Sequence, residues 1–466
     1  MKIQIPHPLY SHAPGGSKGG SKAPLSPGER LGSGPQSKKI NIVTLGCSKN
    51  TVDSEKLLRQ IEAGGYSVVY DPSEMNADTV IINTCGFIND AKEESIDTIM
   101  RFIKANKAGT VENLYVMGCL AERYMSALKS EIPEVKKYFG VSNIHEMLEE
   151  LGIKPSKGFS PERIITSPGH YAYLKISEGC DRTCAFCAIP SIRGKYISRP
   201  MDELLSEAEY LAGAGVKELI LIAQDLSYYG IDIDGKQKLC ELVSELLKIR
   251  EFEWIRLHYL YPANFPMDLI PLIRENPRIC RYIDIPVQHI SDKMLRLMRR
   301  SHNERETRNI LDTLRLELPE AAIRTTLIAG HPGETQKEYS ELRQFISGFR
   351  FDRLGVFSYS HEEGTFSWEN YEDNVSERVK KSRVSELMAI QQSISAELNS
   401  KRIGTILKTV IDRRDGEFFI GRSEYDSPEV DQEILISTVY DLKPGNFYNI
   451  LITEATEFDL SGKPVE

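Results

Sequence analysis

The sequence predicts an α/β protein with an N-terminal open parallel α/β sheet, a central partial (β/α)6 barrel and a small C-terminal antiparallel β-barrel. Two runs of alternating apolar strands and helical stretches predict the first two regions, because this alternation is typical of parallel sheets covered by helices. Short strand-like runs replace the alternation from about Lys401, with turn signals at Asp415-Gly416 and Pro444-Gly445, which predicts the small barrel.

Composition indicates a globular protein preceded by a leader. Residues 1–37 are rich in Gly, Ser, Pro and Lys without periodicity, which predicts a flexible leader or tag, or alternatively a native disordered arm. The formal net charge of −9 does not favour a general nucleic-acid binder. No apolar run reaches the roughly 18 to 20 residues of a membrane span, and no secretory signal is present. We therefore expect no membrane association and a cytoplasmic location.

The N-terminal sheet is predicted over residues 38–153. Its expected strands are Ile40–Leu45, Thr79–Asn83 and Asn113–Met117, with helices over 51–63, 91–107 and from Ala121 onward. Residues 154–169 are rich in Pro, Gly and Ser and are predicted to be a linker.

The central barrel is predicted over residues 170–400. Its expected strands are Ala172–Ser177, Glu218–Asp225, Trp254–Leu260, Tyr282–Val287, Ile323–Ala329 and Arg353–Tyr359. Six strand-helix units are too few for the full eight-unit barrel. Residues 401–466 then form the small barrel, with strands expected over 405–411, 417–421, 433–439 and 447–452.

A CxxxCxxC motif made by Cys180, Cys184 and Cys187 directly follows the first strand of the central barrel. Active sites of α/β barrels lie on loops at the carboxyl ends of the strands. Three thiolates on one loop can hold three irons of a 4Fe-4S cluster and leave the fourth iron open. The alternative is zinc, which takes four ligands, but no fourth Cys or His is near in sequence.

A second group of cysteines is spread along the N-terminal region. Cys47, Cys85 and Cys119 each come just after a predicted strand. The carboxyl ends of parallel strands share one edge, so the three thiols should converge there and hold a second cluster. Alternatively, each is a small buried hydrophobe, as we interpret Cys240 and Cys280.

The CxxxCxxC motif resembles that of the radical S-adenosylmethionine (SAM) superfamily. The resemblance implies that the open iron binds the methionine part of SAM and that cleavage releases a 5′-deoxyadenosyl radical. Further segments match in order, with Gln224-Asp225 where the superfamily often has Gly-Gly-Glu. The implied cofactor-binding residues are Phe186, Gln224, Asp225, Gln288, Ile328 and Gly330.

Two cysteine triads, a radical barrel and a small β-barrel together resemble the methylthiotransferase family, whose C-terminal part is a TRAM domain. The resemblance implies two 4Fe-4S clusters and two molecules of SAM per turnover. One SAM methylates a sulfur at the N-terminal cluster, and sulfide or polysulfide is the implied sulfur source. The other SAM generates the radical, with an electron donor such as flavodoxin or ferredoxin.

The segment Leu45–Glu55, LGCSKNTVDSE, resembles the ribosomal-protein branch of the family, as does Gly421–Asp431. The tRNA branch more typically has a Gly-Cys-Gln-Met-Asn form. The implied substrate is the β-carbon of an aspartate in small-subunit ribosomal protein twelve, free or within the ribosome. The alternatives are a tRNA adenosine methylthiotransferase and a non-catalytic RNA-binding iron-sulfur protein.

Charge in the C-terminal region favours a protein substrate. Residues 401–466 carry 8 basic and 13 acidic side chains, so the barrel should repel RNA phosphates and attract a basic partner. tRNA is therefore not expected as a partner. The alternative is that the acids form an ordinary solvated face. The acidic face would include Glu424, Asp426, Glu429 and Asp431.

Overall fold

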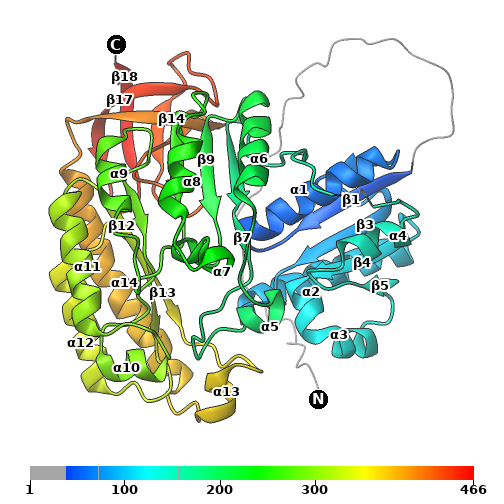
Figure 1. Cartoon of the computed structure of the whole chain (residues 1–466), viewed down its shortest axis with the longest axis horizontal. Helices are drawn as coiled ribbons and strands as arrows, with labels where there is room; N and C mark the ends of the chain where they lie inside the picture. Colours follow the sequence, from blue (N-terminus) through cyan, green and yellow to red (C-terminus); the bar gives the residue numbers. More distant parts are fainter. Residues whose placement is uncertain (1–37, 72, 156–157, 466) are drawn as a thin grey trace.

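The computed structural model describes residues 38–71, 73–155 and 158–465, so the predicted leader lies outside the described residues. Figure 1 shows the N-terminal sheet (blue to cyan) beside the central barrel (green to yellow), with the C-terminal barrel (orange to red) across one end of it. Among the described residues, no helix has the length and apolar character needed to cross a membrane.

The N-terminal region is a five-stranded parallel sheet in the order β2-β1-β3-β4-β5. The three predicted strands form its centre, and their nearly continuous apolar runs fit a sheet buried on both faces. Strands β2 and β5 were not predicted, because they are too short to show a hydrophobic pattern. The strands are β1 (Lys39–Thr44), β2 (Ser67–Val69), β3 (Ala77–Thr84), β4 (Val111–Gly118) and β5 (Lys137–Tyr138). The helices are α1 (Ser48–Ala63), α2 (Asn89–Lys107), α3 (Cys119–Glu131) and α4 (Ile144–Glu150).

The central region confirms the partial barrel of six parallel strands. It consists of two three-stranded sheets, β6-β9-β10 and β11-β12-β13. Two backbone hydrogen bonds join them: the N–H of Cys280 donates to the carbonyl of Ile255 (2.9 Å), and the N–H of Leu260 donates to the carbonyl of Asp284 (2.8 Å). The strands are β6 (Tyr171–Lys175), β9 (Glu218–Ile222), β10 (Trp254–Leu257), β11 (Tyr282–Asp284), β12 (Ala322–Ala329) and β13 (Arg353–Ser358).

Helices cover the outside of this barrel. Two of the larger helices begin with a capping box. The side chain of the N-cap residue accepts a hydrogen bond from the backbone of the third helical residue, whose Glu side chain accepts one from the N-cap backbone. The pairs are Asn303 with Glu306 and Thr335 with Glu338. The larger helices are α6 (Met201–Gly213), α8 (Leu239–Leu246), α9 (Leu269–Glu275), α11 (Glu304–Glu317), α12 (Gln336–Phe349) and α14 (Glu377–Ser400). Shorter elements are β7 (Ser177–Glu178), α5 (Ile189–Arg193), β8 (Ile197–Ser198), η1 (Leu226–Tyr228), α7 (Ile231–Asp234), α10 (Asp292–Leu297) and α13 (Phe366–Asn370).

The C-terminal region is a closed barrel in the order β14-β15-β16-β18-β17. The predicted small barrel is confirmed, but its β16–β18 pairing is parallel rather than antiparallel. Strand β18 was not predicted, because it contains Gly462 and Pro464 and these residue types are uncommon in strands. The strands are β14 (Ile406–Asp415), β15 (Phe418–Ser423), β16 (Ile434–Ser437), β17 (Phe447–Ala455) and β18 (Leu460–Val465).

Candidate functional site

The three N-terminal cysteines lie at the carboxyl edge of the parallel sheet. Cys47 is the N-cap of α1, Cys85 directly follows β3, and Cys119 is the first residue of α3, after β4. Because β1, β3 and β4 are neighbours in the sheet, their carboxyl ends share the edge where open parallel sheets bind ligands. The structure therefore brings these three candidate ligands together.

Gly46 allows the first two of these loops to approach closely. A Cβ atom added there would stand 2.6 Å from the Cβ of Cys85 and 2.9 Å from its sulfur, and Gly46 has a φ of +90°. Glycine adopts this conformation without steric cost. A larger residue would push Cys85 away from its position near Cys47.

Burial favours the protonated form of two of the N-terminal thiols. It raises the pKa of Cys119 to about 12, with Cys47 and Cys85 adding to the rise and Arg193 opposing it. Burial also raises the pKa of Cys85. Metal binding at these thiols must therefore release protons.

The other three candidate ligands lie on the loop between β7 and α5. The backbone N–H of Arg182 donates to the sulfur of Cys180 at 3.4 Å, and the N–H of Cys187 donates to the carbonyl of Cys184 at 3.1 Å. Burial raises the pKa of Cys180 to about 11 and that of Cys187 to about 12, and Cys184 adds to both. One tight loop thus gathers three thiols.

Each triad offers three free thiols, the donor type that iron-sulfur clusters take. Within the described residues, no group of three or more His, Cys, Asp or Glu side chains is arranged to hold one metal ion. Zinc needs four ligands converging on one point, which argues against the zinc alternative. A four-iron cluster takes one thiolate per iron, so its cysteines stand further apart.

Two arginines contact the cysteine loop: Arg182, which belongs to it, and Arg300, which follows α10. Arg300 donates to the sulfur of Cys184 at 3.3 Å and to the carbonyl of Pro286 at 2.7 Å. The guanidinium groups of Arg300 and Arg182 lie 4.1 and 4.0 Å from the centre of the Tyr261 ring. These cations stabilise negative charge at the thiolates of the loop.

Asp225, a predicted cofactor contact, has both carboxylate oxygens occupied. One accepts from Arg182 Nε at 2.8 Å and the other from the N–H of Ser227 at 2.9 Å. The side chain therefore braces the cysteine loop against the end of β9.

Gln288 presents a free acceptor at the carboxyl end of the barrel. It has a φ of 68° and bridges to Leu327 of β12. Its side-chain oxygen is buried and has no hydrogen-bond partner among the described residues. Buried polar atoms are rarely left unpaired, so this oxygen is available to a ligand. Gly330 follows β12 with a φ of +83°. The remaining candidate contacts, Phe186, Gln224 and Ile328, are half-buried.

Arg193 connects the two triads, which sequence analysis did not anticipate. It ends α5, directly after the cysteine loop, and donates to Asn50 at 2.6 Å, Glu178 at 2.8 Å and Asp53 at 3.2 Å. Asn50 and Asp53 belong to α1, which Cys47 caps. The sequence placed Asn50 and Asp53 in the segment that resembles the ribosomal-protein branch, but it did not indicate which residue they contact.

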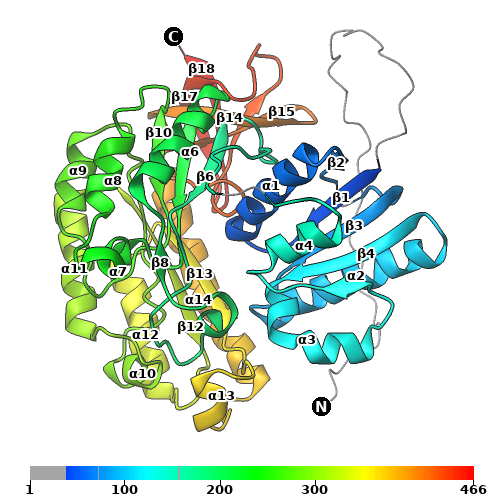
Figure 2. The ribbon, with the colours of Figure 1, turned by 45° about the vertical axis from the view of Figure 1, so that its right-hand side comes forward.

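Helix α1 faces the inside of the central barrel. Val52 packs with Tyr171 and Tyr173 of β6, and Figure 2 shows α1 running beside the barrel strands. Lys49, also on α1, is buried, with its ammonium 3.6 Å from the centre of the Tyr259 ring. Burial lowers the pKa of Lys49 to about 8, although Cys47 opposes this. Residues of α1 therefore reach from the N-terminal triad into the barrel.

Comparisons with known proteins agree with this three-part arrangement. The model of an uncharacterized protein family, UPF0004, matches residues 39–140. The radical SAM superfamily matches residues 174–346, and the TRAM domain matches residues 403–465.

Close relatives cover nearly the whole chain. A protein of Phocaeicola vulgatus is 52% identical over 422 residues, which are 90% of this chain and 98% of the relative. A protein of Christiangramia forsetii is 51% identical over 429 residues, or 92% of this chain and 94% of the relative. Both are named ribosomal protein uS12 methylthiotransferase RimO. The chain belongs to the radical SAM methylthiotransferase family. It is therefore an enzyme that uses a 4Fe-4S cluster and SAM.

The fold of this methylthiotransferase is shared with a more distant solved structure. TsrM from Kitasatospora setae, a radical SAM methyltransferase, gives a TM-score of 0.50 at 13% identity, covering 82% of this chain and 79% of that one. At this identity the likeness concerns the fold alone.

Two of the four acidic side chains predicted for the docking face of the methylthiotransferase's C-terminal barrel do not lie on its surface. Asp426 accepts from Arg353 at 2.9 Å, and Asp431 accepts from the Tyr282 hydroxyl at 2.6 Å, so both are used against the central barrel. Within residues 401–465 the exposed charged side chains are the basic Lys401, Lys408, Arg413, Arg414, Lys443 and Lys463 and the acidic Asp415, Glu417, Glu429, Asp441 and Glu454. The predicted acidic face therefore loses Asp426 and Asp431, which the sum over the sequence counted although both side chains are buried with partners.

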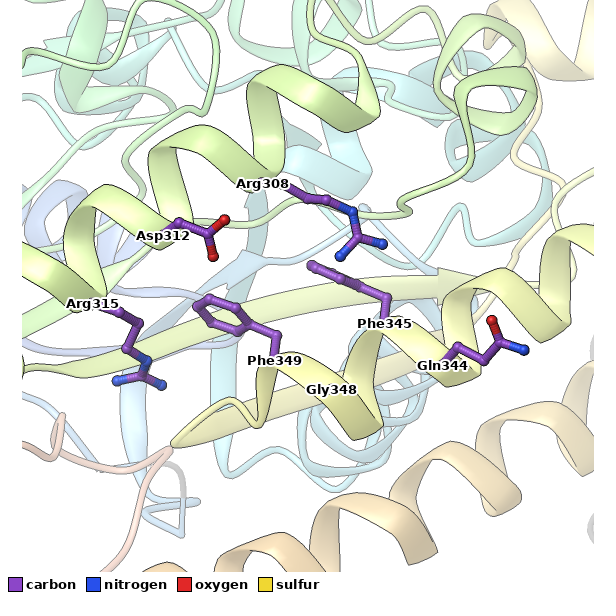
Figure 3. Close-up of a pocket in the computed structure, with 7 residues that line it drawn as sticks. All are labelled: Arg308, Asp312, Arg315, Gln344, Phe345, Gly348 and Phe349. Carbon is purple, nitrogen blue, oxygen red and sulfur yellow. The ribbon is translucent and has the colours of Figure 1, made fainter.

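A pocket of about 340 Å³ lies elsewhere on the enzyme, between α11 and α12. Figure 3 shows Arg308, Asp312 and Arg315 of α11 facing Phe345 and Phe349 of α12. Both arginines have acidic partners, at 2.9 and 2.6 Å, and none of the candidate site residues lines the pocket. It is therefore separate from the candidate site.

Proposed function

We propose that this enzyme adds a methylthio group to the β-carbon of an aspartate in ribosomal protein uS12. The observation that carries the proposal is the name shared by relatives about half identical over at least 90% of the chain. The aspartate follows from the resemblance of the segment Leu45–Glu55 to the ribosomal-protein branch. Its β-carbon carries an unactivated C–H bond, which explains the need for radical chemistry.

Each triad holds one 4Fe-4S cluster. Cys180, Cys184 and Cys187 hold the radical SAM cluster, and Cys47, Cys85 and Cys119 hold a second one. The convergence of three neighbouring strand ends supports the second assignment. When bound, the clusters and SAM supply the chemistry that removes a hydrogen atom from the substrate carbon and provides the methylated sulfur.

The chain's own residues bind and position these groups. Gln288 accepts a hydrogen bond from SAM, which its unpartnered oxygen supports, while Asp225 fixes the cysteine loop through Arg182. Arg193 holds α1, and with it Cys47, against the loop that carries the radical cluster. The other proposed SAM contacts are Phe186, Gln224, Ile328 and Gly330.

The remaining parts of the proposal follow the family resemblance. Sulfide or polysulfide supplies the sulfur, and flavodoxin or ferredoxin supplies electrons. Because the substrate is a ribosomal protein, free or in the assembled subunit, the enzyme works in the cytoplasm. Residues 38–153, 170–400 and 401–466 form the three domains, residues 154–169 link the first to the second, and residues 1–37 form a leader.

The test is a comparison of substrates. Anaerobically reconstituted enzyme is incubated with SAM, sulfide, a reductant and either uS12 or bulk tRNA, and the mass of each product is measured. We expect the mass of one methylthio group on uS12 and none on tRNA, with Cys184→Ala as the inactive control. A gain on tRNA adenosine alone would contradict the substrate. Absence of 5′-deoxyadenosine would instead favour the non-catalytic RNA-binding protein.

A further inference from the structure

Lys49 carries a buried positive charge without an acidic partner. The residue is 5% exposed, and its ammonium lies 3.6 Å from the centre of the Tyr259 ring. Within the described part of the chain it forms no hydrogen bond and no ion pair. A cation removed from water costs free energy unless it is paired, and an aromatic ring offsets only part of that cost.

The carboxylates that act on Lys49 through space are committed to other groups. These are Asp284 and Glu178. Asp284 accepts from Arg324 at 3.0 Å and from the N–H of Tyr259 at 3.1 Å. Glu178 accepts from two further cations at 2.7 and 2.8 Å. Neither carboxylate is therefore left to neutralise Lys49 by direct contact.

Other cations around α1 are paired. Lys175 and Arg193 both bind Asp53, and Lys56 binds Glu207 at 3.1 Å. Among the described cations that join α1 to the central barrel, Lys49 is thus the exception. Its ammonium remains available to a negatively charged group that arrives from outside the protein.

Lys49 also lies between the two triads. It follows Cys47 by two residues on α1, and its aromatic partner, Tyr259, lies two residues after the end of β10. Tyr261, at the end of the same segment, contacts Arg300, which donates to the sulfur of Cys184. A substrate that reacts at both triads must be held near this segment.

We propose that Lys49 binds the side-chain carboxylate of the substrate aspartate and so positions its β-carbon between the two triads. The inference rests on the proposed function. A carboxylate is the group that an unpaired, desolvated ammonium binds most strongly, and in aspartate it is bonded directly to the β-carbon. No bond forms or breaks at Lys49, so it is a specificity-determining residue for the reaction.

The test measures how well the enzyme distinguishes uS12 from uS12 with asparagine at the target position. Affinities of both forms for reconstituted enzyme are measured with SAM but without reductant, so that no turnover occurs. Wild-type enzyme should prefer the aspartate form by roughly 10- to 100-fold, the range expected for a hydrogen bond between charged groups. Lys49→Met should bind both forms about equally, and Lys49→Arg should restore part of the preference.

Lys56→Met is the matched control, because it removes a lysine from the same helix whose partner Glu207 keeps Arg163 and Arg199. It should retain the wild-type preference. Iron content should match wild type in Lys49→Met. If that variant loses iron, Lys49→Gln, which keeps a polar end without charge, is measured in its place.

If Lys49→Met or Lys49→Gln prefers the aspartate form of uS12 as strongly as wild type does, the proposal for Lys49 is wrong. The proposal is also wrong if the wild-type enzyme binds both forms of uS12 equally. Failure of the proposed function looks different. It appears in the wild-type enzyme without any variant, as a methylthio group on tRNA and none on uS12.

Discussion

The two cysteine triads differ in how the chain builds them. Cys180, Cys184 and Cys187 lie on one loop, whose backbone donates to the sulfur of Cys180 and forms a further hydrogen bond between Cys187 and Cys184 within the motif. Cys47 and Cys85 belong to different strand ends and meet Cys119 only because three strands pair side by side. The first triad is therefore a local feature of the sequence, whereas the second depends on the register of a sheet.

The largest expected effect comes from the local triad. Cys184→Ala removes a ligand of the radical cluster, so 5′-deoxyadenosine formation and methylthio transfer should both fall to background. The measurement is anaerobic turnover with product analysis by mass spectrometry. Cleavage of SAM at the wild-type rate would show that this loop does not hold the radical cluster.

The dispersed triad should be separable from the local one. Cys85→Ala should still form 5′-deoxyadenosine but transfer no methylthio group, because the radical loop is untouched. Iron should fall from about eight per chain to about four, the difference of one 4Fe-4S cluster. A wild type with about four irons would rule out the second cluster.

A weaker effect tests the sheet edge itself. Gly46→Ala places a Cβ against Cys85 at a positive φ, so iron in the N-terminal triad should be partly lost while SAM cleavage continues. Gly65→Ala is the matched control: its φ is +88° but nothing lies within 4 Å of the added Cβ. Gly65→Ala should lower the folding stability only by the backbone strain of a non-glycine residue at this φ, about 1–2 kcal/mol, and it should keep the iron. Equal iron loss in both would assign the effect to strain alone.

The connection between the triads should appear in stability. Arg193→Met leaves Lys175 as the remaining cation of Asp53 and Glu178, and losing a hydrogen bond between charged groups costs about 1.5–3 kcal/mol. Urea unfolding of the reconstituted protein measures the loss. A midpoint equal to that of wild type would show that Arg193 does not hold the two parts together.

The smallest effect is expected at an exposed pair. Arg59 binds Glu162 on the outer side of α1 and both side chains are over one-third exposed. Arg59→Met should lower stability by less than about 1 kcal/mol, so it serves as the control for Arg193→Met in the same urea experiment. If Arg59→Met lost as much stability as Arg193→Met, the exposure of an ion pair would not explain how much it contributes to stability.

Much of the fold could be predicted because its signals are local. Alternating apolar strands and helices indicated the parallel sheets, and glycine-containing turns indicated the small barrel. The strands that were missed, such as β18, have either few residues or residues that are uncommon in strands. Pairing direction also escaped prediction, since the parallel contact of β16 with β18 joins segments whose own sequences do not record their neighbour.

The sequence by itself determined the radical cysteine loop, the succession of strands and helices, and the position of each N-terminal cysteine at a strand end. Only the tertiary structure decided which charges are paired and which remain free. It placed Asp426 and Asp431 against the central barrel, joined Arg193 to α1, and left Lys49 without a carboxylate. The physical reason is that periodicity reports the face on which a residue lies within its own element, whereas an ion pair depends on the distance between elements far apart in the chain.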